Sequence, residues 1–189
     1  MAAIIWIDLL NSDWRDHRGQ GRREDRLDRA DWRHAFLQGL QADVSGLPEA
    51  PLKAGLRALR GVLRRNVERV VARGTAGGRS LGDLNRLLGR ALLTRRVTLR
   101  AGSPRLEFVH HARGLDAALG EIAGSFASAL EAGDLARIKI CRNPDCGWVF
   151  YDRSRNRSRR WCDSSTCANL MKVRRFRLRR RGLRRRPRR

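Results

Sequence analysis

The residues of this chain best suited to chemistry are its four cysteines. They follow the pattern C-x4-C-x15-C-x4-C and are Cys141, Cys146, Cys162 and Cys167. Four thiolates arranged as two close pairs are a common ligand set of a structural zinc ion, which prefers tetrahedral coordination. Because four cysteines already fill such a site, no histidine is needed. The spacing therefore predicts one structural zinc ion per chain.

Two disulfide bonds are the alternative use of the same cysteines. Small secreted domains are stabilised in this way, and they carry an export signal. The first residues, MAAIIWIDLLNSDW, do not have the features of such a signal. They lack its positively charged start and its small-residue cleavage site, and Asp8 interrupts their apolar stretch. No segment approaches the ~20 apolar residues needed to cross a bilayer. We therefore expect a cytoplasmic protein with reduced thiols and no membrane partner.

Positive charge is concentrated in the same part of the chain. The sequence carries 42 Lys and Arg against 19 Asp and Glu, a formal net charge of +23. Residues 137–189 hold 20 of the basic and 3 of the acidic residues, a net charge of +17, whereas residues 1–136 carry +6. A block this basic repels itself and binds polyanions. Arginine, the main contributor, can bind phosphate or guanine through two hydrogen bonds, which favours a nucleic acid as partner.

Residues 1–136 are predicted to form a mainly α domain with a core of its own. A short apolar helix is expected over residues 4–14, and two further helices over about 81–92 and 115–132. Between these two, RRVTLR and PRLEFVHH flank AGS and predict a small β-hairpin. The strongest helical stripe follows a breaker segment and consists of Leu52, Leu56, Leu59, Leu63, Val67 and Val70.

Polar residues of this domain indicate local structure more than catalysis. The highly charged residues 15–29 predict an exposed loop. Asp31 is the expected N-cap of the helix that follows, and Ser80 with Asp83 has the spacing of a capping box. No nucleophile with a matching base and acid emerges, so we expect no enzymatic activity.

Residues 137–181 are predicted to form a small zinc module, and residues 182–189 an Arg-rich disordered tail. The segments WVFYD and SRRWC would pair as a β-hairpin between the two cysteine pairs. Asp163 or a following serine would cap a helix that continues beyond Cys167. This order of knuckle, hairpin and helix is typical of a treble-clef or zinc-ribbon arrangement. Four aromatic side chains would pack around the metal: Trp148, Phe150, Trp161 and Phe176.

The basic side chains of the module are the candidate nucleic-acid contacts. A helix that is basic over most of its surface fits the major groove of double-stranded DNA, where arginines contact phosphates and base edges. The Arg-rich stretch before Cys162 suits RNA equally well, so RNA is the alternative partner. The candidates are Arg153, Arg155, Arg157, Arg159 and Arg160 in that stretch, and Lys172, Arg174, Arg175, Arg177 and Arg179 in the helix.

The module resembles the CGNR zinc-finger family, whose members carry an N-terminal ABATE domain. The resemblance rests on CRNPDCGWVFYDRSRNRSRRWC, a further cysteine and the basic helix, and more weakly on IDLLNS near the start. Cys167 and Asn169 match two positions of the CGNR signature, while Ala168 and Leu170 replace its glycine and arginine. The resemblance implies that Asn169 joins the nucleic-acid contacts, with neighbouring basic residues able to replace the missing arginine.

The resemblance also implies a function. It is that of a bacterial, stress-related transcription regulator of the nucleoid, whose ABATE domain senses a small-molecule effector or forms a homodimer. Asn11, within IDLLNS, is the candidate ligand-binding residue, and a local turn or cap bond is its structural alternative. An RNA-binding or ribosome-associated protein and an enzyme acting through the helical domain are the other interpretations.

Overall fold

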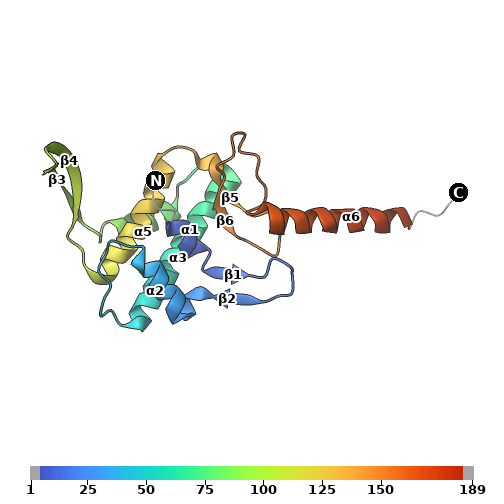
Figure 1. Cartoon of the computed structure of the whole chain (residues 1–189), viewed down its shortest axis with the longest axis horizontal. Coiled ribbons are helices and arrows are strands. Elements are labelled where there is room, and N and C mark those ends of the chain that lie inside the picture. Colours follow the sequence, from blue (N-terminus) through green and yellow to red (C-terminus); the bar gives the residue numbers. More distant parts are fainter. Residues whose placement is uncertain (1–4, 185–189) are drawn as a thin grey trace.

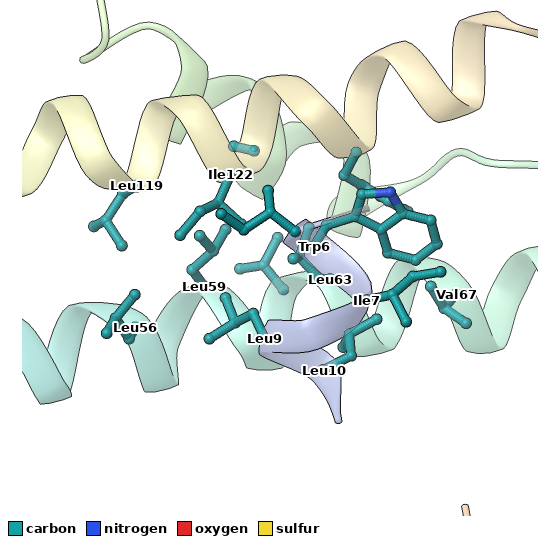
Figure 2. Close-up of a cluster of buried hydrophobic side chains, with 14 of the residues drawn as sticks. Trp6, Ile7, Leu9, Leu10, Leu56, Leu59, Leu63, Val67, Leu119 and Ile122 are labelled. Carbon is teal, nitrogen blue, oxygen red and sulfur yellow. The ribbon is translucent and has the colours of Figure 1, made fainter. Parts of the chain in front are cut away.

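Three helices form the centre of the molecule (Figure 1). The computed structural model describes residues 5–184, and its central helices are α1 (Ile5–Leu10), α3 (Glu49–Arg73) and α5 (Gly114–Glu131). Figure 2 shows α1 lying between α3 and α5, with the apolar side chains of all three meeting. The fold is therefore mainly helical around one core, as the sequence predicts.

The stripe on α3 is buried as its spacing predicts, because residues three and four apart share one face of a helix. It consists of Leu52, Leu56, Leu59, Leu63, Val67 and Val70. Across from it, Trp6 of α1 packs edge-on against Phe126 of α5, with ring centroids 5.0 Å apart. The helix ends at Gly74, whose φ of 70° is a left-handed conformation that glycine adopts without strain.

Smaller elements surround these helices. The remaining helices are α2 (Ala30–Gln38), α4 (Arg79–Leu88) and α6 (Asn169–Arg184), with short 3-10 turns at Arg26–Asp28 and Leu135–Arg137 and a π turn at Ser164–Ala168. Three antiparallel hairpins pair β1 (Asp13–Arg15) with β2 (Arg23–Asp25), β3 (Leu93–Arg100) with β4 (Ser103–His110), and β5 (Ile138–Ile140) with β6 (Val149–Tyr151). The second of these confirms the hairpin expected from the sequence.

Two predicted helix caps are wrong. α2 begins at Ala30 with Arg29 at the cap position, so Asp31 lies inside its first turn, where a negative charge still complements the helix dipole. α4 begins at Arg79, because Gly78 with a φ of 71° turns the chain into the helix two residues earlier than expected. Ser80 therefore lies within the helix.

The predicted loop over residues 15–29 is also wrong in part. Residues 13–15 and 23–25 pair as β1 and β2, with Trp14 opposite Glu24, and a 3-10 turn follows. Leu27 of that turn is fully buried in the core. The charges of this segment look solvated in the sequence, but Asp25 and Asp28 pair with Lys53, Arg57 and Arg60 of α3.

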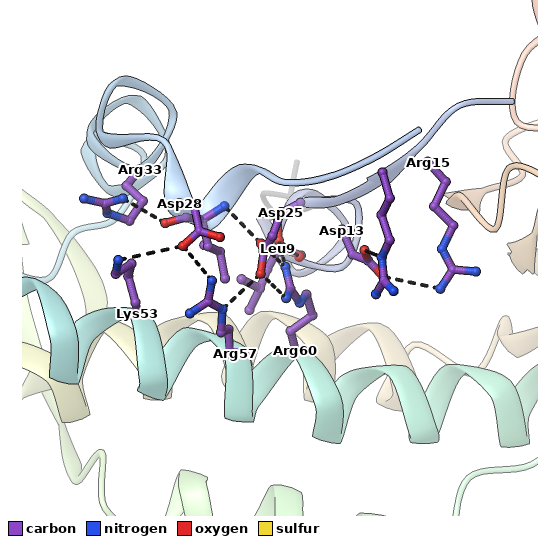
Figure 3. Close-up of polar contacts among 12 residues, drawn as sticks. Leu9, Asp13, Arg15, Asp25, Asp28, Arg33, Lys53, Arg57 and Arg60 are labelled. Carbon is purple, nitrogen blue, oxygen red and sulfur yellow. Dashed lines mark hydrogen bonds and ion pairs between the residues drawn. The ribbon is translucent and has the colours of Figure 1, made fainter. Parts of the chain in front are cut away.

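Asp25 is the centre of that pairing (Figure 3). Its carboxylate accepts hydrogen bonds from Arg60 at 2.7 and 2.8 Å and from Arg57 at 3.0 Å, both on α3. Burial raises the pKa of Asp25, but the hydrogen bonds from these arginines outweigh burial and hold the pKa well below its ordinary value. The N-terminal hairpin is thus fixed against the central helix by charge-assisted hydrogen bonds.

The first hairpin of the zinc module packs into the core of the helical domain, while the cysteines form a small buried cluster of their own with Trp148 and Trp161. Ile138 of β5 and Val149 of β6 are 2% and 0% exposed, and they belong to the same buried cluster as Leu9 and Leu63. The hairpin that leads into and out of the first cysteine pair is therefore packed directly onto the central helices. A change in the knuckle consequently reaches the core through packed side chains.

Asn11 makes this connection specific. Its side-chain Nδ2 donates to the carbonyl of Val149 at 2.9 Å, and the backbone N–H of Val149 donates to its Oδ1 at the same distance. The side chain is buried and completes the outer edge of β6 as a neighbouring strand would. This long-range pairing replaces the local turn bond expected from the sequence, whereas a ligand contact by Asn11 stays a prediction.

The ends of the chain add little to this frame. α6 continues to Arg184, so residues 182–184 extend the helix, and the rest of the expected disordered tail lies outside the described residues. No helix in the described range 5–184 combines the length and apolar character needed to span a membrane.

We predict that Asn11→Ala destabilises the whole chain by about 2–4 kcal/mol, because it leaves one buried donor and one buried acceptor of Val149 unpaired. Urea unfolding followed by circular dichroism measures the loss. Asn85→Ala, at an exposed position of α4, is the matched control and should cost less than about 0.5 kcal/mol. Equal stability of the two variants would show that the Asn11 pairing is dispensable.

Candidate zinc centre and basic surface

The four cysteines converge on one point although they come from two distant segments. Their Sγ atoms all lie within 4.8 Å of one another, and the Sγ atoms of Cys146 and Cys162 are 3.8 Å apart. Four sulfurs at about 2.3 Å from a tetrahedral zinc ion lie about 3.8 Å from each other. The set therefore fits one zinc ion closely, and all four residues are free thiols rather than disulfides. Zinc bound there has a structural role, since the protein supplies every ligand.

A tight knuckle at the end of the β5–β6 hairpin presents the first pair. The backbone N–H of Cys141 donates to Trp148 at 2.8 Å, and that of Cys146 donates to Asn143 at 3.0 Å. Gly147 follows with a φ of 64°, which lets the chain turn back into β6. Hydrogen bonds to its sulfur from the neighbouring thiols of Cys146 and Cys162 lower the pKa of Cys141, and the same contacts raise the pKa of Cys146 and Cys162.

The second pair is presented by a capped turn. Asp163 accepts the N–H of Thr166 at 2.7 Å and so caps the π turn that carries Cys167, as the sequence predicts. Asn143 donates from Nδ2 to the sulfur of Cys167 at 3.5 Å and to the carbonyl of His17 at 2.8 Å. One amide thus orients a ligand of the second pair and ties the knuckle to the N-terminal segment.

The hairpin predicted between the cysteine pairs does not form. The segment WVFYD does supply a strand, β6, but β6 pairs with β5, and residues 152–162 form no strand. The earlier strand of residues 138–140 was therefore the correct partner. It lies beside the knuckle, where the close approach of Cys141 and Cys146 already brings the two segments together.

Asp152 organises the arginine-rich loop that replaces the missing strand. Its buried carboxylate accepts from Lys139 at 2.6 Å, from Ser154 at 2.6 and 2.9 Å, and from the N–H of Arg159 at 2.9 Å. Burial raises the pKa of Asp152, but the hydrogen bonds from Lys139, Ser154 and Arg159 outweigh burial and leave the pKa well below its ordinary value. Both ends of the loop are therefore held by one ionised carboxylate.

The loop presents the arginines that the sequence identifies. Arg153, Arg155, Arg157, Arg159 and Arg160 are all exposed. Arg157 pairs with Asp134 at 3.3 Å, and Arg159 lies over the ring of Phe150 and donates to the carbonyl of Cys162. The side chains of Arg153, Arg155 and Arg160 form no ion pair, ring contact or hydrogen bond in the described structure, so their guanidinium groups are available to an anion.

α6 presents the second group of candidates. The helix begins at Asn169 directly after the Cys167 turn and projects away from the body of the molecule (Figure 1). Every charged residue in it is basic, and the exposed members of the predicted set are Asn169, Lys172, Arg175, Arg177 and Arg179. The loop and the helix therefore form one basic end of the protein.

Arg174 differs from its neighbours on α6. Its Nη1 pairs with Asp145 of the knuckle at 2.6 Å, and its Nη2 donates to the carbonyl of Arg18 at 2.8 Å. The side chain therefore fixes the start of the helix to the zinc knuckle and the N-terminal segment. Its position favours an anchor for the helix, and a nucleic-acid contact by Arg174 stays a prediction.

The aromatic residues surround the metal site only in part. Trp148 and Trp161 pack against the cysteines, and Phe150 is buried nearby. Phe176 does not join them, because α6 carries it away from the body and leaves it 59% exposed beneath Arg180. The predicted packing of Phe176 around the metal is therefore wrong.

Sequence reasoning missed the polar residues that support the site. Lys139, Asn143, Asp145 and Asp152 hold the loop, the knuckle and α6 in place without binding the metal. A usable signal existed, because residues 137–189 contain only three acids and two of them are in this set. An acid kept within so basic a segment is a strong candidate for a structural role.

Comparison with known families agrees with this geometry. Residues 137–180 match the CGNR zinc finger, and residues 5–133 match the ABATE domain, described as "Putative stress-induced transcription regulator". The chain belongs to the ABATE family. Its C-terminal zinc finger carries the complete set of four cysteine ligands. No curated protein matches the chain.

We predict that Asp152→Asn lowers the stability of this ABATE protein at pH 7 by about 2 kcal/mol, because Lys139 loses its buried counter-charge. The folded pKa lies below the ordinary value of about 3.9, so the stabilisation is fully present above pH ~4 and is lost as the pH falls further. Urea unfolding at pH 3, 5 and 7 would show a difference from the wild type that shrinks only at the lowest pH.

Two controls accompany this measurement. Zinc content is determined at each pH, because acid also protonates the thiolate ligands. Asp116→Asn removes an exposed carboxylate at the start of α5 and should leave stability nearly unchanged. An Asp152→Asn variant as stable as the wild type at pH 7 would contradict the assigned role.

Proposed function

We propose that this chain is a zinc-dependent transcription regulator that binds double-stranded DNA and has no catalytic activity. The observation that carries the proposal is α6, a basic helix that starts two residues after a zinc ligand and projects from the body with Lys172, Arg175, Arg177, Arg179 and Arg180 exposed. Zinc fixes the direction of the helix, and the helix supplies the contacts. Such a protein acts on the nucleoid in the cytoplasm.

The dimensions of α6 suit the major groove. Sixteen residues of α-helix are about 24 Å long and, with side chains, about 10–12 Å wide. The major groove of B-DNA is about 12 Å wide and accepts a helix, whereas the major groove of A-form RNA is too narrow. Exposed arginines on α6 can reach base edges, and those of the 153–160 loop can contact the phosphate backbone.

RNA binding remains the competing proposal, because phosphate attraction is common to both nucleic acids. The arginine-rich loop would suit an RNA as well as DNA. The projecting helix is the feature that favours DNA.

Selection from random double-stranded DNA, with structured RNA as competitor, tests the proposal. We expect an enriched sequence motif and an affinity that falls steeply with salt, because bound arginines displace counterions. Arg175→Ala with Arg179→Ala, one turn apart on α6, should weaken binding and reduce the slope of log affinity against log salt by about 2. Fluorescence anisotropy measures both quantities.

The matched control is Arg73→Ala with Arg90→Ala, which removes two equally exposed arginines from the ABATE domain. This variant should keep most of the affinity and the salt slope. Preference for the RNA competitor would overturn double-stranded DNA as the partner. Equal loss in both double variants would show that total charge, and not α6, determines binding.

We also propose that the ABATE domain senses a small aromatic amine at its contact with the zinc knuckle. A pocket of about 260 Å³ lies there. Asp8 faces it and forms no ion pair within the described part of this strongly basic chain, and partial loss of water around its carboxyl raises its pKa. Aromatic walls beside a carboxylate suit a flat cation. The lining residues are Asp8, Asn11, Arg26, Trp32, Ala35, Phe36 and Trp148.

Tryptophan fluorescence tests this effector proposal, because Trp32 and Trp148 line the pocket. Tryptamine is a suitable probe, and indole-3-acetate is its anionic counterpart. We expect tryptamine to quench the emission and Asp8→Asn to weaken its binding about 10-fold, the loss typical of a charged hydrogen bond. Asp116→Asn, which removes another exposed acid, should bind as the wild type does. Binding that is insensitive to Asp8 or equal for the anion would contradict the proposal.

A further inference from the structure

The β3–β4 hairpin is an amphipathic arm with an uncovered apolar face. Opposite residues of an antiparallel pair share one face of the sheet, and alternate residues along each strand face opposite ways. Val97 pairs with Leu106 and Leu99 with Pro104, so these four residues lie on one face near the tip. Leu93 and Arg95 follow on the same face toward the base, so the apolar part of this face is its outer half. The other face carries Thr94, Arg96, Thr98, Arg100, Ser103, Arg105, Glu107 and Val109.

The apolar face of the arm is exposed to solvent. Val97 is 69% exposed, Leu99 is 73% exposed and Leu106 is 58% exposed, the first two among the most exposed large apolar side chains that the structure describes. The side chains of the polar face form ion pairs with one another, since Glu107 pairs with Arg100 at 3.2 Å and with Arg96 at 3.6 Å. The arrangement is thus that of a sheet whose core side has no second layer.

A two-stranded hairpin of this kind needs a partner. Isolated two-stranded ribbons are marginally stable in water, and they become stable when their apolar face packs against another layer. Solvent-exposed apolar patches on otherwise charged proteins mark interaction sites. In Figure 1 the arm extends from the body at the end opposite to α6. Nothing within residues 5–184 covers its apolar face.

We propose that the apolar face of the β3–β4 arm is a homodimer interface, in which the arms of two copies pack face to face. Charge opposes the approach of a second copy less at this end than at the other, although each arm itself carries four arginines and one glutamate. Residues 137–189 carry a net charge of +17, so two copies repel each other most strongly where these residues lie. The arm is the far end of the molecule, where that repulsion is weakest, and its arginines on the polar face point to solvent in the paired arrangement.

The geometry of the arm also agrees with a symmetric contact. A two-fold axis perpendicular to the strands stacks the Val97 and Leu99 row of one copy on the same row of the other, and Leu106 and Pro104 likewise, which matches apolar to apolar on both sides. Two sheets stacked in this way lie about 10 Å apart. The dimer leaves both α6 helices free at its two ends.

The size of the contact sets its strength. Eight residues per strand span about 27 Å, so two strands give a face of only a few hundred Å². Standard interfaces bury about 800 Å² on each partner. The arm-to-arm contact is smaller, and a dimer with a micromolar dissociation constant is the expected result.

Sedimentation equilibrium of the full zinc-loaded chain, freed of nucleic acid and run at high salt, tests the proposal. Between about 1 and 100 µM the wild type should pass from monomer to dimer. Val97→Asp with Leu99→Asp should raise the dissociation constant at least about 100-fold, because charges would be buried in the apolar contact. These substitutions lower the positive charge of the chain, so added repulsion cannot explain the loss.

Thr94→Asp with Thr98→Asp is the matched control, since it adds the same charge to the polar face of the same strand. It should dimerise as the wild type does, and circular dichroism should confirm that both variants keep the helical fold. A wild type that stays monomeric at 100 µM overturns the proposal. So does a Val97→Asp and Leu99→Asp variant that still dimerises, or a control that becomes monomeric to the same extent.

Discussion

Two hydrogen bonds between the Asn11 amide and the backbone of Val149 join parts of the chain that are 138 residues apart. They hold the strand that leaves the zinc knuckle against the first helix, and Ile138 and Val149 pack beside them into the central core. The ABATE domain and the zinc finger are consequently in direct contact through two hydrogen bonds and a shared part of the core.

The few acids of the basic region explain how so many like charges can be positioned. Asp145 holds Arg174, Asp152 holds the loop of residues 153–160, and Asp163 caps the turn that carries Cys167. Each of the three acids in residues 137–189 is thus used for structure. Within the described residues, Arg153, Arg155, Arg160, Arg175, Arg177 and Arg179 are exposed and form no ion pair, which leaves their charge available to a polyanion. One acid also holds several basic side chains in the N-terminal hairpin, where Asp25 accepts hydrogen bonds from Arg57 and Arg60 of α3.

Sequence reasoning succeeded where a local pattern decides the outcome. The stripe on α3, the β3–β4 hairpin and the Asp163 cap follow from spacing within short segments, and the structure confirms them. It failed where the partner lies elsewhere in the chain. Residues 13–25 form a hairpin whose Asp25 pairs with Arg57 and Arg60 of α3, and β6 pairs with β5 instead of with the segment before Cys162. Asn11 and Arg174 are used in contacts that no local pattern indicates.

The sequence by itself determined the ligand set of the metal, the helical character of the fold and the basic end of the protein. These depend on residue type and on spacing along the chain, because thiolates select zinc and charge adds up regardless of conformation. Only the tertiary structure decided which residues are held and which are free. A buried carboxylate such as Asp152 or an anchored cation such as Arg174 is identified by its distant neighbours, and those neighbours come together only when the core is packed.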